Sequence, residues 1–402
     1  MDPAQVTRAD VEAAAVLLRG VVRDLPLATA RWLEEAIGGE VRLVTENLQR
    51  AGSFKLRGAY ARIAAMSEEE RSKGVVAASA GNHAQGVAVA AQRLGVQATV
   101  FMPVGAALPK IAATSGYGAQ VRFAGSTVDE ALDAARAFAA ETGAVLVHPF
   151  DHPAVVAGQG TVGLEILEKM PEVRTIVACT GGGGLLAGIA VAVAAERPDV
   201  RIVGVQAAGA AAYPQSIVAG EPIRLESMST MADGIAVGRP GDVPFSIIQE
   251  HVDRIVTVSE EEISRAVLML LERSKLLVEP AGAAAAAAVL AHPHDFEPPV
   301  AVVLSGGNVD PLVLLRIIRH GLVAAGRYLT VQVRMADRPG SLARLLNEVQ
   351  DTGSNVVDIE HHRVDPDLRI DEVDIVLHLE TRGAEHCSQV LERLHGAGYQ
   401  VR

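Results

Sequence analysis

The chain has 402 residues with a formal net charge of −12, and it contains 49% hydrophobic and 21% charged residues. This composition predicts a folded chain of two or three domains and excludes an intrinsically disordered one. The acidic balance argues against a general nucleic-acid binder, which needs a basic face for phosphates, but local donors could still bind small anions.

Cysteine content and apolar runs give expectations about the compartment. The only two cysteines, Cys179 and Cys387, lie far apart without metal-ligand spacing, as in a reduced cytoplasmic protein. The first residues carry acids and no continuous apolar core, so we expect no signal peptide. The alanine-rich tract 281–291 is too short to span a bilayer, so we expect a soluble protein.

Short β-branched runs alternate with helical patterns through most of the chain. Runs that are apolar throughout, with helices between them, are typical of buried parallel strands in an α/β fold. We expect region 50–150 to form a small sheet and region 155–320 a larger one. The expected strands are 74–79, 97–103, 119–125, 144–150, 174–180, 201–207, 253–259 and 300–305.

The pattern changes near residue 326. Residues 328–336 alternate between apolar and polar, an amphipathic helix follows, and two alternating runs, a second helix and the short strand "YQVR" complete the chain. The order βαββαβ predicts a ferredoxin-like unit with its helices on one face. We therefore expect a domain at 1–325, with a small subdomain at about 50–153, and a second domain at 326–402.

Three glycine-rich segments follow expected strands, the third being "VVLSGGNVD" with Ser305. Gly181 to Gly184 can turn backbone N–H groups toward one anion at a helix start, which predicts a phosphate-binding turn; the alternative is a plain tight turn. The turn lacks the Lys-Ser/Thr of a P-loop and does not match G-x-G-x-x-G. In "SAGNHAQG", Ser79 to His83 offer donors for a carboxylate.

The second segment also allows another interpretation. "AASAG" is a variant of the nucleophile elbow of α/β-hydrolases, which would make Ser79 a nucleophile and require a later Asp and His. His251, His292 and His320 are available, but none lies in a recognisable signature. His83 could instead serve only in packing at the helix start.

Ser305 and Lys55 are the remaining candidates. Ser305 ends a buried strand in "LSGGN", where its hydroxyl could contact a ring nitrogen or merely cap a helix. Lys55 lies in the small and apolar stretch "AGSFKLRGAY". Its stem could reach the surface, or its amine, with a lowered pKa, could form a Schiff base with pyridoxal 5′-phosphate.

Six motifs in order carry a family resemblance. "SFKLRGA", "SAGNHAQG", "GGGGL", "ADGIAV", "VEPAGA" and "LSGGN" resemble those of fold-type II pyridoxal-phosphate enzymes, and most closely the threonine/serine dehydratases (threonine ammonia-lyases). The C-terminal unit, with "DRPGSL", resembles an ACT domain. The resemblance implies two parallel-sheet α/β domains similar to the tryptophan synthase β subunit, plus a regulatory ferredoxin-like ACT domain.

The resemblance also implies a role for each matching residue. Lys55 would be the Schiff-base lysine and base, Phe54 would pack on the ring, and Ser305 would contact the ring nitrogen. The remaining positions would bind cofactor (Asn82, Gly181, Gly182, Gly183, Gly184, Leu185, Gly234 and Glu279) or the substrate carboxylate (Ser79, Gly81, Asn82 and His83). No metal ligand is expected, because "VQAAGAAAYP" lacks the acids of the racemases' divalent-cation site.

The implied reaction is β-elimination. Where related serine racemases have a serine that works as an acid/base on the far face of the substrate, this chain has Ala80, so loss of water from threonine or serine is favoured over racemisation. The ACT unit implies a homo-oligomer (dimer or tetramer) with isoleucine or valine as effector. The alternatives are a lyase acting on serine or hydroxyaspartate, a serine racemase, an α/β-hydrolase and a non-catalytic amino-acid sensor.

Overall fold

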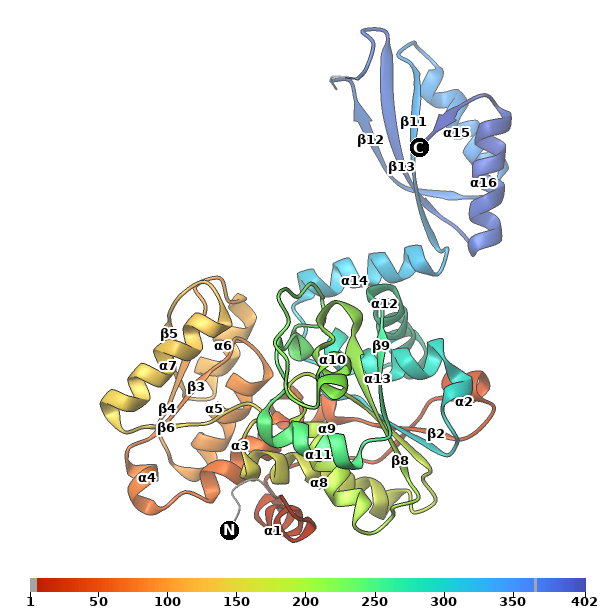
Figure 1. The fold of residues 1–402 in the computed structure, drawn as a ribbon. Coiled ribbons are helices and arrows are strands. Elements are labelled where there is room, and N and C mark those ends of the chain that lie inside the picture. Colours follow the sequence, from red (N-terminus) through yellow and green to blue (C-terminus); the bar gives the residue numbers. More distant parts are fainter. Residues whose placement is uncertain (1–5, 365–366) are drawn as a thin grey trace. The chain divides into compact units, whose positions relative to one another are not determined.

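The computed structural model describes residues 6–364 and 367–402, which divide by their internal contacts into two units, Met1–Leu314 and Leu315–Arg402. The first unit contains two sheets with helices around them (Figure 1). Its helices are α1 (Arg8–Leu18), α2 (Arg31–Ile37), α3 (Lys55–Ala64), α4 (Glu68–Ser72), α5 (Asn82–Leu94), α6 (Leu108–Gly116), α7 (Val128–Thr142), α8 (Pro153–Lys169), α9 (Gly184–Ala194), α10 (Ala212–Ala219), α11 (Asp242–His251), α12 (Glu260–Met269) and α13 (Pro280–Ala291).

The small sheet has the order β5-β4-β3-β6, and all its strands are parallel. Helices α5 and α7 both pack on β3 and β4, so the two central strands are fully buried. The strands are β3 (Val75–Ala78), β4 (Ala98–Met102), β5 (Gln120–Phe123) and β6 (Val145–Leu146).

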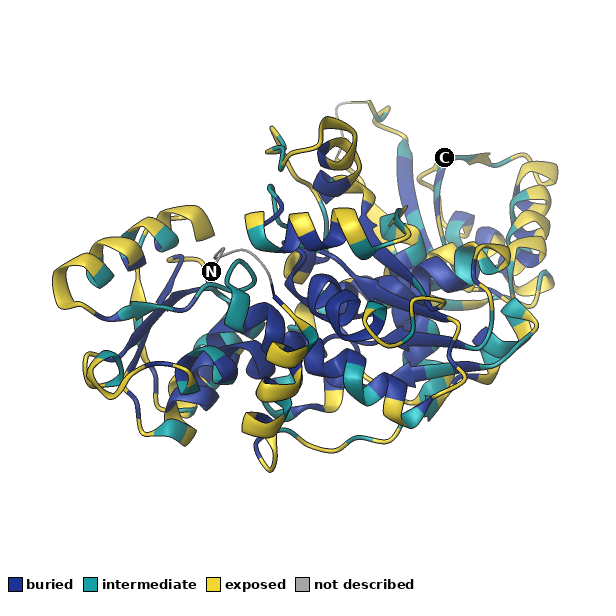
Figure 2. Ribbon diagram, turned by 60° about the horizontal axis from the view of Figure 1, so that its bottom comes forward, coloured by how far each residue is buried: buried dark blue, intermediate teal, exposed yellow. Residues whose placement is uncertain are grey.

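The large sheet has the order β1-β2-β10-β7-β8-β9, and only the β1–β2 pair is antiparallel. The fully apolar helix α9 lies against α8, and both are mostly buried (Figure 2). The strands are β1 (Ala28–Thr29), β2 (Val41–Val44), β7 (Thr175–Cys179), β8 (Arg201–Ala207), β9 (Arg254–Val258) and β10 (Val300–Val303).

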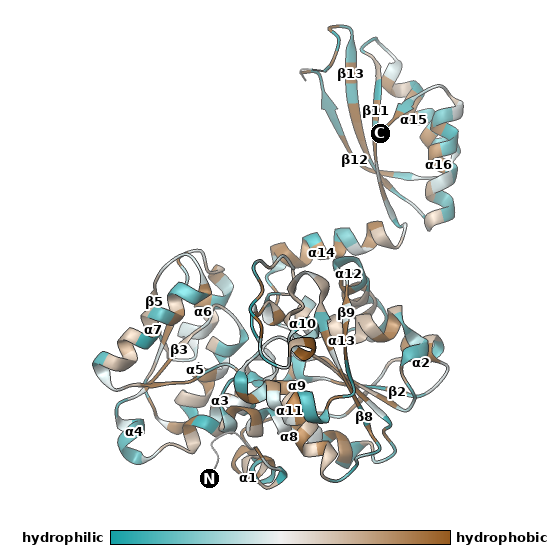
Figure 3. Cartoon of the chain, in the orientation of Figure 1, coloured by the Kyte–Doolittle hydropathy of each residue, from teal (hydrophilic) through white to brown (hydrophobic). Residues whose placement is uncertain are grey.

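The predicted fold class is confirmed: all eight expected strands exist, in two parallel sheets. One detail was wrong, because the large sheet also takes β1 and β2 from before residue 50. Only four residues, "VRLV", separate Glu40 from Thr45, which is too short a run to show a period. Figure 3 shows apolar residues concentrated in the sheets, whereas helices such as α4 and α7 carry hydrophilic residues.

The second unit is the predicted ferredoxin-like sheet, with strand order β12-β13-β11-β14 and antiparallel pairing throughout. Apolar residues of α15 and α16 pack with those of the strands in one core. Its elements are α14 (Pro311–Ala324), which begins in the first unit, β11 (Tyr328–Ala336), α15 (Ser341–Asp351), β12 (Asn355–His362), β13 (Glu372–Glu380), α16 (Ala384–Gly396) and β14 (Gln400–Val401). Among the described residues, no helix combines the length and the apolar character needed to cross a bilayer.

Candidate active site

The predicted site residues follow the carboxyl ends of strands in both parallel sheets. Ser79 comes directly after β3, the turn Gly181–Gly184 follows β7, and Ser305 follows β10. Ligands of open parallel sheets bind at these ends, because the loops and helix N-termini meet there. The fold thus places three separate motifs at ligand-binding edges.

Lys55 is the first residue of α3 and is partly buried. Its Nζ donates a hydrogen bond to the Pro149 carbonyl at 3.1 Å and lies 5.0 Å from the centroid of the Phe54 ring. A Cβ at Gly86 would lie 3.0 Å from the Lys55 carbonyl carbon, so only glycine allows α5 to approach this closely. The amine is held inside the molecule, unlike that of a surface lysine.

The surroundings change the acidity of this amine. Burial lowers the pKa of Lys55 to about 8, although Cys179 and Glu279 act in the opposite direction. An ordinary lysine is almost fully protonated near neutral pH, whereas this one is about one-tenth neutral at pH 7 and about half neutral at pH 8. A neutral amine can act as a nucleophile or accept a proton.

The four-glycine turn has no room for side chains. A Cβ at Gly182 would collide with the Phe150 ring, and one at Gly183 with the Tyr213 hydroxyl. Gly183, with φ +100°, is the N-cap of α9, whose first N–H groups have no intrahelical acceptor. The turn is therefore built so that bare backbone donors can approach an anion.

Residues 148–150 connect Lys55 to this turn, and sequence reasoning missed them. The Pro149 carbonyl accepts from Lys55 Nζ and from Gln159 Nε2 at 3.2 Å, and the Phe150 ring packs on Gly182. The available signal was position, because "HPF" follows β6 at the carboxyl edge of the small sheet. The contact uses a backbone carbonyl, which no residue type reveals.

The predicted carboxylate loop lies at the start of α5. Ser79 Oγ accepts from the Gly81 N–H at 3.1 Å, and the His83 Nε2–H donates to the Val147 carbonyl at 2.7 Å. Burial lowers the pKa of His83 to about 3, so its ring is neutral. Within residues 6–364 and 367–402, Ser79 Oγ has no other hydrogen-bond partner, so the histidine contact that a hydrolase elbow requires is missing.

Asn82 and Glu279 are in direct contact. Asn82 Nδ2 donates to Glu279 Oε1 at 2.5 Å, and burial raises the pKa of Glu279 to about 7 against the effect of this hydrogen bond. Gly234 lies beside them, because a Cβ there would be 3.6 Å from Glu279 Oε1. These three predicted positions therefore form one cluster.

Ser305 is buried and joins the other motifs. Its carbonyl accepts from the Phe54 N–H at 3.2 Å, and its Oγ accepts from Cys179 Sγ at 3.1 Å. Cys179 is the last residue of β7, just before the glycine turn. Ser305 thus links Phe54, the residue before Lys55, to the end of β7.

The assembled groups suit one kind of ligand. Bare N–H groups favour a phosphate, the partly neutral amine an aldehyde, the Ser305 hydroxyl a ring nitrogen and the Asn82 amide a ring oxygen. Pyridoxal 5′-phosphate carries all four groups, so the residues present fit this cofactor. In the described part of the chain, no three His, Cys, Asp or Glu side chains are grouped to hold a metal.

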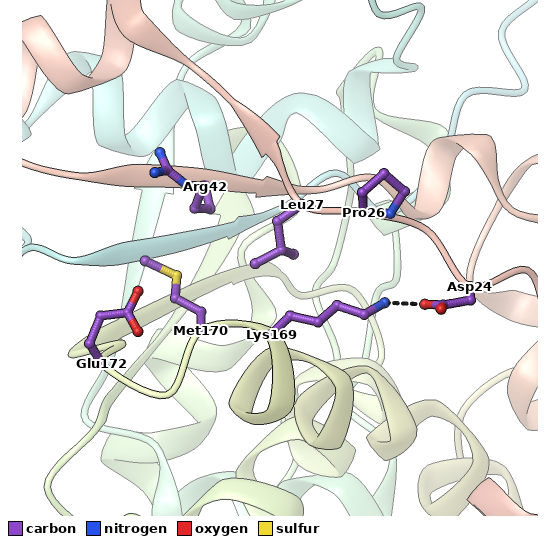
Figure 4. Close-up of a pocket in the computed structure, with 7 residues that line it drawn as sticks. All are labelled: Asp24, Pro26, Leu27, Arg42, Lys169, Met170 and Glu172. Atoms are coloured by element: carbon purple, nitrogen blue, oxygen red, sulfur yellow. Dashed lines mark hydrogen bonds and ion pairs between the residues drawn. The ribbon is translucent and has the colours of Figure 1, made fainter.

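A surface cleft of about 510 Å³ lies elsewhere on the first unit and contains none of the predicted residues (Figure 4). Both of its cationic side chains are already paired, with Lys169 Nζ 2.6 Å from Asp24 Oδ1 and Arg42 Nη1 2.7 Å from Glu34 Oε1. We assign no ligand to this cleft.

Comparisons with known proteins agree with the geometry. Residues 18–306 match the model of the pyridoxal-phosphate dependent enzyme family, and residues 329–396 match the ACT domain. An L-threonine ammonia-lyase of Thermotoga maritima is 47% identical over 397 residues, which cover 99% of both chains.

Two solved structures are similar to this chain over about three quarters of its length. A threonine deaminase from Solanum lycopersicum superposes with a TM-score of 0.76 at 36% identity, covering 78% of this chain and 87% of the other. Maize serine racemase gives a TM-score of 0.74 at 34% identity, with coverages of 77% and 96%. This chain therefore belongs to the pyridoxal-phosphate dependent enzymes of fold type II, and it carries a C-terminal ACT domain.

Proposed function

We propose that this enzyme is a threonine ammonia-lyase that converts L-threonine to 2-oxobutanoate and ammonia, and L-serine to pyruvate. One observation carries the proposal: the partly neutral amine of Lys55 bonds to the Pro149 carbonyl, and the next residue, Phe150, packs on the four-glycine turn that we propose binds the phosphate. The full-length similarity to an L-threonine ammonia-lyase supports this substrate. Residues 1–325 would form the catalytic domain and 326–402 the regulatory one, in a cytoplasmic protein with two free cysteines.

The loop at the start of α5 would bind the substrate carboxylate. Ser79, Gly81, Asn82 and His83 surround the first N–H groups of this 13-residue helix, where its dipole favours a negative charge. Because the His83 ring is neutral and its Nε2–H is engaged by Val147, binding would depend on hydrogen bonds rather than on an ion pair.

When bound, pyridoxal phosphate supplies an electron sink for the bonds at the substrate Cα. Lys55 Nζ would take the proton from Cα, because its lowered pKa leaves much of the amine neutral near pH 8. The Pro149 carbonyl would hold this amine between proton transfers. The Ser305 hydroxyl is uncharged, so it cannot keep a ring nitrogen protonated as an aspartate would.

Ala80 favours elimination over racemisation. Racemisation needs a proton acceptor and a proton donor on opposite faces of Cα, and the methyl side chain of Ala80 can be neither. Similarity to maize serine racemase makes racemisation of serine the second candidate function.

The proposed activity is tested by product analysis. We expect threonine to yield 2-oxobutanoate, with serine and hydroxyaspartate turned over more slowly. The preference should be modest, because a pocket discriminates one methyl group by only about 1–3 kcal/mol. Keto acids are quantified by chromatography and D-serine by a chiral assay. D-serine as the main product, or no keto acid from threonine, would contradict the proposal.

The ACT domain would regulate this reaction. A cavity of about 320 Å³ is lined by Arg338, Gly340, Ser341 and His361 among others, at the start of α15. The helix N-terminus suits a carboxylate, and Asp337, paired with Arg363 at 2.8 Å, suits an ammonium group. We propose isoleucine or valine as the effector, in a homodimer or homotetramer that pairs these domains.

Effector titration checks the regulatory proposal. Isoleucine or valine should change the threonine concentration at half-maximal rate. Asp337→Asn should weaken this response at least about tenfold, the effect expected from losing a charge-assisted hydrogen bond. Initial rates over a series of amino acids measure it. If no amino acid changes the rates, the domain serves only in assembly.

A further inference from the structure

Asn308 ends the S-G-G-N turn after β10 and contacts two segments beside Lys55. Its Nδ2 donates to the Ala51 carbonyl at 2.7 Å and to Asn82 Oδ1 at 2.9 Å. Gln85 Oε1 lies 3.3 Å from the same nitrogen. The two amide hydrogens thus join the turn that precedes α3 to the first turn of α5.

The turn before α3 has an unusual conformation. Ala51 and Gly52 both have positive φ, +61° and +68°, which an L-residue such as Ala51 rarely adopts. The Asn308 amide lies directly against Gly52, where a Cβ would collide with it. Asn308 therefore packs on this turn and bonds to it, three residues before Lys55.

The Asn308 amide also fixes the orientation of the Asn82 amide. Asn82 Oδ1 accepts from Asn308, while Asn82 Nδ2 donates to Glu279 Oε1. A reversed Asn82 amide would place its oxygen against the carboxylate and its NH₂ group against that of Asn308. Both contacts would be repulsive, so only one orientation satisfies the cluster.

We propose that Asn308 is a positioning residue that holds the Asn82 amide with its second N–H free for the ring oxygen of pyridoxal phosphate. This inference depends on the cofactor roles given above for Asn82 and Lys55. Asn308 acts through Asn82 and through the Ala51–Gly52 turn rather than on the reacting atoms.

Glu279 alone would not hold Asn82 this way at every pH. Its pKa of about 7 leaves the carboxyl partly protonated near neutral pH, in a setting shared with Lys110, Asp233 and Lys55. A protonated carboxyl can also donate a hydrogen bond, so Glu279 could then donate to the oxygen of a reversed Asn82 amide. Asn308 is an uncharged donor whose preference does not change with pH.

The test compares Asn308→Asp with the wild-type holoenzyme. Aspartate keeps the size but replaces the donor by a carboxylate that repels Asn82 Oδ1 and the Ala51 carbonyl. We expect a shifted visible absorbance of bound pyridoxal phosphate and its loss on dialysis accelerated roughly tenfold or more. The kcat should fall about 10–100-fold, as for loss of a partly buried hydrogen-bond donor. Asn308→Ala removes the donor without adding a charge, so it should show the same three changes with a smaller magnitude.

Asn47→Asp is the matched control. Asn47 is buried, whereas Asn308 is half-buried, and it donates from Nδ2 to the Leu277 carbonyl at 3.0 Å without a hydrogen bond to Asn82 or to the Ala51–Gly52 turn. It should lower the melting temperature and leave the spectrum and cofactor retention unchanged.

Two outcomes would overturn the inference: wild-type spectrum and retention in both Asn308 variants, or the same spectral change in Asn47→Asp. Absorbance and dialysis need no substrate, so a wrong substrate assignment leaves these measurements valid. A wild-type protein that binds no pyridoxal phosphate would instead refute the proposed function.

Discussion

Replacing Lys55 by alanine is expected to abolish turnover and the visible absorbance of covalently held cofactor. The variant loses both the amine that attaches the cofactor and the base that faces the substrate Cα. Removal of a general base alone lowers rates about 10²–10⁴-fold, so the loss of both functions should lower the rate by at least about 10⁴-fold. Steady-state kinetics and an absorbance spectrum of the purified protein measure both effects.

Lys169→Ala is the control for this variant. Lys169 is also partly buried in the first unit, but its Nζ pairs with Asp24 in the surface cleft of Figure 4 and lies 3.8 Å from Glu165. Its loss should leave the spectrum and kcat unchanged. Retained turnover in Lys55→Ala would refute the assignment of Lys55.

Lys55→Ala should also change how the stability of the cofactor-free protein depends on pH. In the cofactor-free fold the pKa of Lys55 is about 8, below the ordinary lysine value of 10.5, so protonation disfavours the folded state. The penalty is absent above pH 10.5, grows as the pH falls towards 8, and is complete below that, where it reaches about 3 kcal/mol. Lys55→Ala should therefore be more favourable for stability at pH 7 than at pH 10.5, and an equal effect at both would contradict the burial of this amine.

The parallel core could be predicted because strands that are buried on both faces have almost continuous apolar sequences. Runs such as "IVAC" and "VAVV" are apolar at every position, whereas an antiparallel strand with one solvated face would alternate. Strand β2 was missed because its four residues include Arg42, whose guanidinium pairs with Glu34 and Glu40. A short strand that carries a charge gives no period to detect.

The candidate site was predictable where it depends on residue type, and less so where it depends on backbone. The motifs around Lys55, Asn82 and Ser305 were recognised from side-chain chemistry and order. The Pro149 carbonyl was not, since every residue has one. Asn308 stood in a quoted motif without a role, because its partners Ala51 and Asn82 lie more than 220 residues away in sequence.

Arg57 shows a third reason for a missed feature. It lies two residues after Lys55 in "SFKLRGA", where a charge would be expected to reach solvent. In the structure its side chain is 1% exposed and donates to Glu46 at 2.7 and 2.8 Å and to Glu165 at 2.5 and 3.0 Å. Burial opposes its charge, but the two carboxylates outweigh it and raise the pKa of Arg57.

This buried network ties α3 to the segment after β2 and to α8, so it fixes the helix that begins with Lys55. Arg57→Met should lower the free energy of unfolding by about 3–5 kcal/mol, because Glu46 is buried and would keep an unpaired charge. Glu165 is more exposed and retains Lys169 nearby, so it contributes less to the loss. Denaturant unfolding measures the difference.

The double variant Arg57→Met/Glu46→Gln distinguishes two contributions to the loss of stability, namely lost packing and the unpaired buried charge of Glu46. Once Glu46 is neutral, methionine can fill the space of the arginine stem, and the double variant should recover at least about 2 kcal/mol relative to Arg57→Met alone. Arg136→Met, which breaks an exposed pair with Asp133, should change stability by no more than about 0.5 kcal/mol. If the double variant were no more stable than Arg57→Met, the cost would come from shape rather than charge. Arg57 would then hold the start of α3 by packing alone.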